Sequence, residues 1–145
     1  MSAPRVDRPV VATVGFAARA NGDGVAYAAI RGSEQSEEQV VRVPFACTPL
    51  PALLGRDVAY AATEALAAEL LRRNLRRVLF RIDEDNLAHD IADRRALPTA
   101  LTVPYVRLRC TLNRFREARI VRFADRTSRD LTARARAEAL LDIAA

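Results

Sequence analysis

The sequence predicts one domain of the mixed α/β (α+β) class, with five strands and four helices in the order βββαβααβα. Two observations support this prediction. The first 45 residues contain apolar, valine-rich runs separated by turn formers, and the rest of the chain alternates between alanine-rich helical stretches and short apolar runs. With 145 residues, 50% hydrophobic and 28% charged, the chain has the size and composition of a single soluble core.

The N-terminal part predicts three strands. Residues 9–18 and 25–31 are apolar, and the turn formers Asn-Gly-Asp-Gly separate them, which is typical of a β-hairpin. The polar residues 32–38 predict a loop, and the alternating residues 39–45 predict a third strand. Pro44 cannot donate to a ladder, so we expect it at the end of this strand or on an edge of the sheet.

The middle of the chain predicts a long helix and a buried strand. Residues 55–74 are rich in alanine and leucine, which are strong helix formers, and four arginines follow near the helix end, where positive charge is favourable. Residues 78–82 form a short apolar run that is typical of a strand inside a sheet. Three acids follow directly, and residues 86–95 predict a short helix.

The C-terminal part predicts two helices with a strand between them. Residues 105–116 are mostly helical in composition, residues 118–123 predict a fifth strand, and residues 128–145 predict a final helix rich in alanine and arginine. We therefore expect a flexible N-terminus over residues 1–8 and a single domain over residues 9–145.

Composition narrows the classes of function. All 23 basic residues are arginine, 18 residues are acidic, and the net charge is +5, so the chain is attractive to polyanions such as nucleic acid. Cys47 and Cys110 form no metal-binding pair and His89 is the single histidine, which argues against a zinc site. No apolar run is long enough to cross a bilayer and no signal-peptide core is present, so we expect a cytoplasmic protein with no membrane partner.

The element order and a series of short motifs resemble the ribonuclease H-like superfamily, and in particular its bacterial reverse-transcriptase-like branch. Residues 58–63 (VAYAAT) stand where that branch has a helix beginning AEYxAL, and residues 81–84 (RIDE) stand at its strand ending in Asp. Residues 126–136 (RTSRDLTARAR) resemble its motif before the last helix. The resemblance implies a five-stranded mixed sheet, three antiparallel strands then two parallel ones, flanked by helices.

The resemblance also implies a site in which four carboxylates hold two divalent ions, Mg²⁺ or Mn²⁺, around a phosphodiester. Carried over position by position, the first-strand aspartate falls at Gly15, the helix glutamate at Ala59 and the last aspartate at Ala133, or at Arg134 if the register slips by one. Only Asp83 retains its carboxylate. Because one carboxylate cannot hold two ions, we expect a degenerate active site and no resident metal.

Other acids offer limited replacement. Asp57 and Glu64 fall on other faces of their helix than Ala59, and we interpret Glu84 as an N-terminal helix charge. Asp83 has a second interpretation as the cap of the next helix, and His89 as a surface residue. The acids from which a metal site could be rebuilt are Asp83, Asp85 and Asp130.

We therefore expect a catalytically inactive domain that binds nucleic acid, an RNA–DNA hybrid or duplex, through arginines. The arginines expected to contact phosphate are Arg19, Arg126, Arg129, Arg134 and Arg136. Two alternatives stay open. One is a structural or protein-interaction module, either a homo-oligomer or a subunit of a larger assembly, and the other is a residual metal-dependent endonuclease. The surroundings of Asp83 distinguish them, because acids there favour catalysis and arginines favour binding.

Overall fold

The computed structural model of the protein describes residues 8–32, 38–93 and 97–144. Almost all of the predicted N-terminal tail and most of the predicted loop over residues 32–38 therefore lie outside the described residues. Within the described parts, no helix is long and apolar enough to cross a membrane.

A five-stranded mixed sheet forms the centre of the molecule, with the order β3-β2-β1-β4-β5. The three N-terminal strands, β1 (Val10–Ala18), β2 (Asp23–Gly32) and β3 (Gln39–Ala46), form an antiparallel meander. Strand β4 (Arg77–Ile82) pairs in parallel with β1, and β5 (Glu117–Arg122) pairs in parallel with β4. The sheet predicted from the sequence is confirmed, and Pro44 lies on the edge strand β3 as expected.

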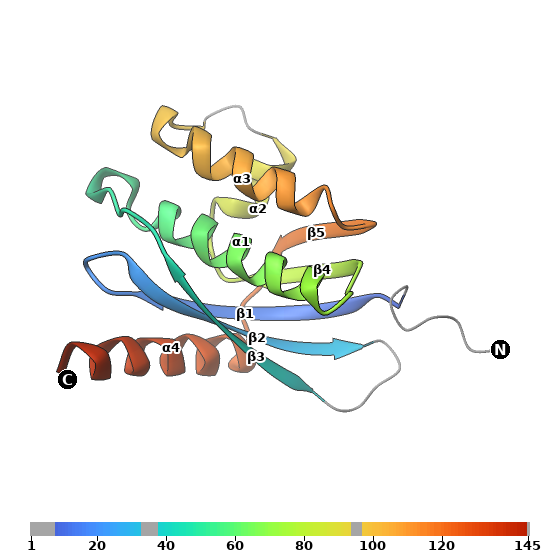
Figure 1. The fold of residues 1–145 in the computed structure, drawn as a ribbon, viewed down its shortest axis with the longest axis horizontal. Coiled ribbons are helices and arrows are strands. Elements are labelled where there is room, and N and C mark those ends of the chain that lie inside the picture. Colours follow the sequence, from blue (N-terminus) through green and yellow to red (C-terminus); the bar gives the residue numbers. More distant parts are fainter. Residues whose placement is uncertain (1–7, 33–37, 94–96, 145) are drawn as a thin grey trace.

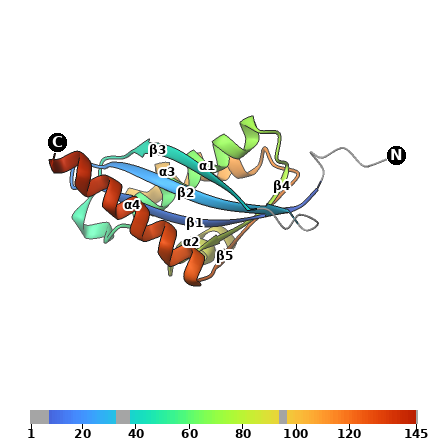
Figure 2. The ribbon, with the colours of Figure 1, turned by 90° about the horizontal axis from the view of Figure 1, so that it is seen from below.

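Helices cover the two faces of the sheet unequally. Helices α1 (Arg56–Arg72), α2 (Leu87–Ala92) and α3 (Thr102–Leu112) lie on one side, whereas α4 (Arg126–Ala144) lies alone on the other (Figure 1). Seen from the α4 side, this helix crosses the sheet diagonally (Figure 2). Single 3₁₀ turns, Pro51–Leu53 and Thr99–Leu101, precede α1 and α3.

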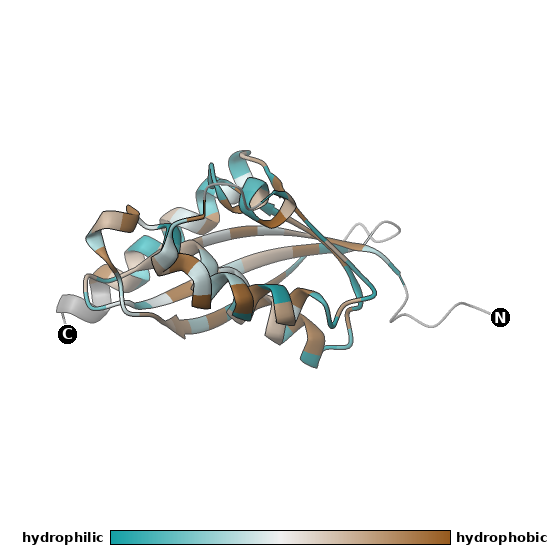
Figure 3. Cartoon of the chain, turned by 90° about the horizontal axis from the view of Figure 1, so that it is seen from above, coloured by the Kyte–Doolittle hydropathy of each residue, from teal (hydrophilic) through white to brown (hydrophobic). Residues whose placement is uncertain are grey.

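The alternation of side chains along β1 separates two cores. Ala12 and Val14 face α1 in the larger core, where Tyr60, Leu66 and Phe80 are almost fully buried. The smaller core lies under α4, and its members are Val25, Tyr27, Ala29, Leu131 and Ala135. Hydrophobic residues recur along the strands and along the helices above them (Figure 3), and those of the larger core are buried between these two layers. Hydrophobic burial therefore fixes both layers against the sheet.

Two helix starts differ from the prediction for identifiable reasons. Helix α4 begins at Arg126 and not at residue 128, because Asp125 and Ser128 exchange side-chain to backbone hydrogen bonds of 2.9 Å, a reciprocal N-terminal cap. Helix α3 begins at Thr102 and not at residue 105. Pro104 lies in its first turn, where the missing N–H would have no intrahelical partner.

Candidate functional site

Gly15 and Asp83 lie side by side at the carboxyl end of β4. Strands β1 and β4 run parallel, and their last paired residues are Val14 and Ile82. Gly15 and Asp83 follow these two residues, so the sheet brings together two positions that are 68 residues apart in the sequence. Ligands of open α/β sheets bind outside the carboxyl ends of parallel strands, which makes this edge the candidate functional site.

Helix α4 closes one side of this site against Gly15. A Cβ atom built at Gly15 would lie 2.4 Å from the backbone nitrogen of Thr132 and 2.7 Å from both the carbonyl carbon and the Cβ of Leu131. Contacts this short are not made by real Cβ atoms. The close approach of α4 therefore leaves no room for any side chain at this position, a carboxylate included.

A guanidinium group lies beside the acids that follow β4. Arg122, at the end of β5, is paired with Ile82 in the sheet. Its Nε lies 3.0 Å from Oδ1 of Asp85, and its Nη2 lies 4.0 Å from Oδ1 of Asp83. All three side chains are substantially exposed, so these ion pairs add little to stability, but they place a cation directly against both carboxylates.

Ala59 and Ala133 are the other two positions at which the resemblance places metal ligands. Both carry small side chains, and their environments differ. Ala59 in α1 has no exposed surface, so it faces the protein interior. Ala133 is exposed on α4, and the residues of α4 that reach Gly15 are its neighbours Leu131 and Thr132. Neither position presents a polar group to the edge where Asp83 stands.

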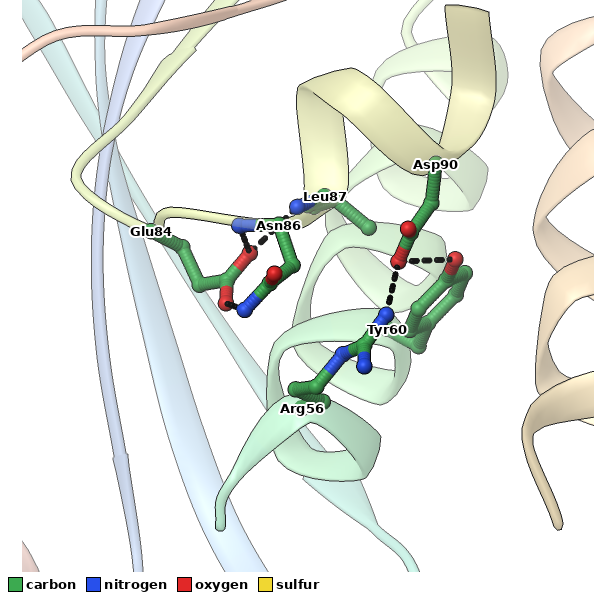
Figure 4. A network of polar contacts seen from close by, with 6 residues as sticks. All are labelled: Arg56, Tyr60, Glu84, Asn86, Leu87 and Asp90. Atoms are coloured by element: carbon green, nitrogen blue, oxygen red, sulfur yellow. Dashed lines mark hydrogen bonds and ion pairs between the residues drawn. The ribbon is translucent and has the colours of Figure 1, made fainter. Parts of the chain in front are cut away.

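Glu84 caps α2. Its carboxylate accepts hydrogen bonds from the backbone N–H groups of Asn86 and Leu87, the first of 2.9 Å (Figure 4). The structure thus gives the capping role to Glu84, and the carboxylate of Asp83 is left beside Arg122.

Asp90 is a buried acid that sequence reasoning missed. It points from α2 toward α1, where its Oδ2 accepts hydrogen bonds from Arg56 Nη2 at 2.8 Å and from the Tyr60 hydroxyl at 3.1 Å (Figure 4). Burial, together with the Asp90 charge, raises the pKa of Tyr60, so this hydroxyl stays protonated as a donor. Its spacing in the sequence could have revealed it: Asp90 is three residues after the apolar Leu87, which places both on the inward face of α2.

Asp57, at the start of α1, is the second buried acid, and it also has a structural role. Its Oδ2 accepts a hydrogen bond of 2.7 Å from the backbone N–H of Leu50, and its Oδ1 accepts one of 2.9 Å from the N–H of Val58. These bonds join the start of α1 to the loop that follows β3. Asp57 is therefore committed to the loop and does not replace a carboxylate at Ala59.

Solved structures with the same arrangement of elements identify the fold. RNase H1 from the halophilic archaeon Halobacterium salinarum superposes with a TM-score of 0.71 and 18% identity, over 92% of this chain and 98% of that chain. The chain has the ribonuclease H fold. No protein-family model and no curated protein sequence matches it.

Two further structures share the ribonuclease H fold of this chain. LC11-RNase H1, solved in complex with an RNA/DNA hybrid, has a TM-score of 0.62 and 14% identity, over 90% of this chain and 99% of that one. The N-terminal RNase H domain of a Mycobacterium tuberculosis protein, solved as a fusion with maltose-binding protein, has a TM-score of 0.59 and 16% identity, over 92% and 99%. These identities are low, so the likeness concerns the fold.

The residues at this edge do not fit the pair of divalent ions that the resemblance to ribonuclease H implies. Mg²⁺ requires about six oxygen ligands in near-octahedral geometry. Among residues 8–32, 38–93 and 97–144, no group of three His, Cys, Asp or Glu side chains is placed to hold a metal ion. Asp83, Asp85 and Asp130 are therefore not assembled into a site, and Arg122 occupies the surroundings of the first two.

The arginines expected to contact phosphate separate into three groups on this ribonuclease H fold. Arg126, Arg129 and Arg136 are exposed, and their spacing of three and seven residues places them on the outward side of α4. Arg19 lies at the end of β1, beside a cavity of about 270 Å³ that Arg42 and Glu138 also line. The structure thus brings together only part of the predicted set.

Arg134 belongs to a polar cluster that joins α4 to β2 and β3. Its guanidinium carbon lies 4.6 Å above the ring of Tyr27, whose hydroxyl donates a 2.7 Å hydrogen bond to Oε2 of Glu138. Arg42 donates a 2.7 Å hydrogen bond from Nε to Oε1 of the same carboxylate, and this bond lowers the pKa of Glu138. The cluster was missed because Tyr27 and Glu138 are 111 residues apart in the chain.

Proposed function

We propose that this ribonuclease H-fold domain binds an RNA–DNA hybrid or duplex through arginines and does not cleave it. One observation carries the proposal. At the sheet edge where the resemblance places metal ligands, the guanidinium of Arg122 lies against Asp83 and Asp85. An edge that binds metal presents negative charge to cations, whereas here an arginine already compensates part of the negative charge of the two carboxylates.

Loss of cleavage follows from the ligands that two-metal chemistry requires. Two ions stabilise the attacking and leaving oxygens only if several anionic oxygens hold them in place. Here the position at Gly15 is closed by the backbone of Thr132, and Ala59 is fully buried. Asp83 is left as the one carboxylate in a position that the resemblance assigns to a metal ligand.

Binding is supported by the exposed arginines of α4. A rise of about 1.5 Å per residue places Arg129 and Arg136 about 10 Å apart along one side of the helix. Guanidinium groups bind phosphate oxygens in a bidentate manner, and the net charge of +5 favours association with a polyanion. Of the structures that share the fold, LC11-RNase H1 was solved with an RNA/DNA hybrid.

The test is the salt dependence of binding to a labelled RNA–DNA hybrid, measured by fluorescence anisotropy. The double variant Arg129→Gln/Arg136→Gln is expected to reduce the slope of log K against log salt by about 2, one per lost phosphate contact. The matched control is Arg107→Gln/Arg114→Gln, which removes the same charge from exposed positions in and directly after α3, on the opposite side of the sheet. An equal reduction of this slope in the two double variants would contradict a specific role for α4.

A cleavage assay addresses the second half of the proposal. The same hybrid is incubated with the protein in Mg²⁺ and in Mn²⁺, and no product is expected. Metal-dependent cleavage that Asp83→Asn removes would contradict the proposal and restore the alternative of a residual nuclease. Cleavage that survives Asp83→Asn comes from a contaminating enzyme.

A second function, as a protein-interaction module, is favoured by exposed apolar side chains near the start of α3. Leu50 and Val103 are 44% and 61% exposed and line one cavity, and Leu54, just before α1, is 91% exposed. Light scattering distinguishes this function, because self-association that Val103→Ser and Leu54→Ser abolish supports it. A monomer over a wide concentration range argues against a homo-oligomer.

A further inference from the structure

The face of the sheet under α4 is only partly covered. Helix α4 packs on β1 and β2, and its diagonal course leaves part of the sheet open (Figure 2). In β4, Val78, Phe80 and Ile82 are buried in the larger core, so Arg77, Leu79 and Arg81 face the opposite side. An open groove of about 540 Å³ lies over these residues and over β1 and β5. That volume is typical of sites for small ligands.

Three arginines surround Leu79 in this groove. Arg77 and Arg81 precede and follow Leu79 by two residues on β4, and Arg119 is the partner of Leu79 on β5. Side chains two residues apart on a strand share a face and are about 6.6 Å apart, and neighbouring strands are about 4.8 Å apart. Arg119 therefore lies about 8 Å diagonally from Arg77 and from Arg81, so the three charges converge on one apolar side chain.

The guanidinium groups of these three arginines form no ion pair with a carboxylate of the described residues. Among the described residues, Arg77 and Arg119 make no ion pair, and the Nε of Arg77 is shielded from solvent without a hydrogen-bond acceptor. Arg81 has its guanidinium carbon 4.4 Å above the ring of Phe123. Cations that lack acceptors at a partly enclosed surface favour an anionic ligand.

Four arginines and three acids line the groove, so it keeps a formal excess of one positive charge. Glu38 forms an ion pair of 3.3 Å with Arg31, at the far side of the groove. Asp125 accepts the backbone N–H of Ser128 as the cap of α4. Glu117 is paired with Arg77 in the sheet ladder but makes no ion pair with it.

We infer that this groove binds a small phosphorylated molecule that carries both a multiply charged phosphate part and an apolar or planar part, as a nucleoside triphosphate does. The three arginines supply bidentate donors for phosphate oxygens. Leu79 lies between them, and Val11 pairs with Leu79 from β1; both line the floor and contribute apolar surface for the uncharged part. The guanidinium of Arg81 lies over the ring of Phe123, a contact that favours this position of the charge.

The groove is separate from the residues that the binding test of the proposed function addresses. It covers the β4 residues Arg77 to Arg81, whereas the candidate functional site lies beyond Ile82 and Arg129 and Arg136 lie on the outward side of α4. The groove reaches the start of α4 only at its edge, through Asp125 and Thr127. Loss of one activity is therefore not expected to remove the other.

The inference is tested by titrating ¹⁵N-labelled protein with pyrophosphate and separately with ATP, with amide shifts as the readout. Saturable shifts are expected for β4 and β5 with both probes. Arg119→Ala is expected to lower the affinity for both probes about tenfold, because one charge-assisted contact is lost. Arg107→Ala, on the opposite face of the sheet, is expected to leave both affinities unchanged. Arg119 is exposed and has no partner to lose, so the variant is expected to fold.

A second variant separates the two parts of the ligand. Leu79→Ala is expected to lower the affinity for ATP several-fold and to leave the affinity for pyrophosphate unchanged, because only ATP carries a planar group. The inference is overturned if neither probe saturates at millimolar concentration, if Arg119→Ala binds as the wild type does, or if Leu79→Ala affects both probes equally. A groove that binds neither probe, in a protein whose hybrid affinity falls with Arg119→Ala, belongs to the nucleic-acid interface and also overturns it.

Discussion

Gly15 of β1 lies directly under the backbone of Thr132 in α4, with room for hydrogen and for nothing larger. The contact joins the first strand of the sheet to the last helix of the chain. It brings α4 against the sheet at the position where the resemblance to ribonuclease H places the first carboxylate. This packing of α4 is therefore incompatible with a carboxylate side chain at Gly15.

Substitution of Gly15 is expected to destabilise the protein. Gly15→Ala forces α4 away from β1, and overpacking of this kind lowers the free energy of unfolding by about 1–3 kcal/mol. Gly15→Asp is expected to cost more, because it also places a charge against the helix backbone. Urea unfolding followed by circular dichroism measures both variants. An unchanged unfolding midpoint for Gly15→Ala would show that α4 does not approach β1 this closely.

The acids beside Arg122 give opposite expectations for a binding protein and for a nuclease. Asp83→Asn and Asp85→Asn each remove a negative charge that repels phosphate, so each is expected to raise affinity for the hybrid about two- to threefold at low salt, the effect of one charge acting through water over several ångströms. In a two-metal nuclease, loss of the carboxylate at Asp83 would instead remove cleavage. Anisotropy at low and high salt measures the effect, which is expected to decrease as salt screens it.

Loss of Arg122 is expected to have the opposite effect on the affinity for the hybrid. Arg122→Ala exposes the charges of Asp83 and Asp85 and removes a cation from the same edge, so hybrid affinity is expected to fall. The free energy of unfolding is expected to change by less than about 1 kcal/mol, because the ion pairs are exposed. The triple variant with Asp83→Asn and Asp85→Asn is the control, and it is expected to recover part of the lost affinity. Affinity that is the same in all these variants would place the interface elsewhere.

The buried acid Asp90 is expected to be important for stability. Asp90→Ala leaves the partly buried Arg56 without its ion pair and the Tyr60 hydroxyl without an acceptor. Breaking a buried pair of this kind costs about 3 kcal/mol, whereas Tyr60→Phe removes one hydrogen bond and costs about 1 kcal/mol. Chemical denaturation measures both variants. Equal stability of Asp90→Ala and the wild type would mean that the pair adds nothing to the contact between α1 and α2.

Stability is expected to decrease at alkaline pH. Burial raises the pKa values of Tyr27 and Tyr60 in the folded state above the ordinary value of 10.0, so the folded protein holds these protons more tightly than the unfolded chain does. The stabilising effect is complete below pH 10.0 and is lost as the pH rises above it, because the unfolded chain ionises first.

The chain has no lysine, so no amine side chain titrates in the same range. Tyr60→Phe is expected to reduce the alkaline loss of stability, measured as the unfolding midpoint between neutral pH and high pH. A Tyr60→Phe profile parallel to that of the wild type would contradict the assignment to Tyr60.

The sequence was sufficient for the order of the elements because local composition differs sharply between them. Valine-rich runs broken by turn formers predicted β1 to β3, and the alanine-rich stretch predicted α1, all of which the structure confirms. The predicted first residues of α3 and α4 were less accurate. The start of α3 depends on Pro104 in its first turn, and the start of α4 depends on the hydrogen bonds exchanged between Asp125 and Ser128.

The candidate site was only partly predictable. Asp83 was placed at the end of a buried strand from sequence, but its neighbour Arg122 follows 39 residues later and reaches it only because β5 pairs with β4. Likewise, the spacing of Arg126, Arg129 and Arg136 was visible in the sequence, whereas the stacking of Arg134 on Tyr27 required α4 to cross β2. Pairing and packing between distant segments are set by the whole core.

The sequence by itself determined the order of strands and helices, and its resemblance to ribonuclease H predicted that three of four expected carboxylates are replaced, at Gly15, Ala59 and Ala133. Only the tertiary structure decided which residues surround the candidate site and the groove. Helix α4 occupies the space above Gly15, Arg122 lies against Asp83, and three arginines from two strands meet around Leu79. Hydrogen-bonded pairing of β4 with β1 and β5 and hydrophobic burial under α4 bring these residues together, because both act between residues far apart in the chain.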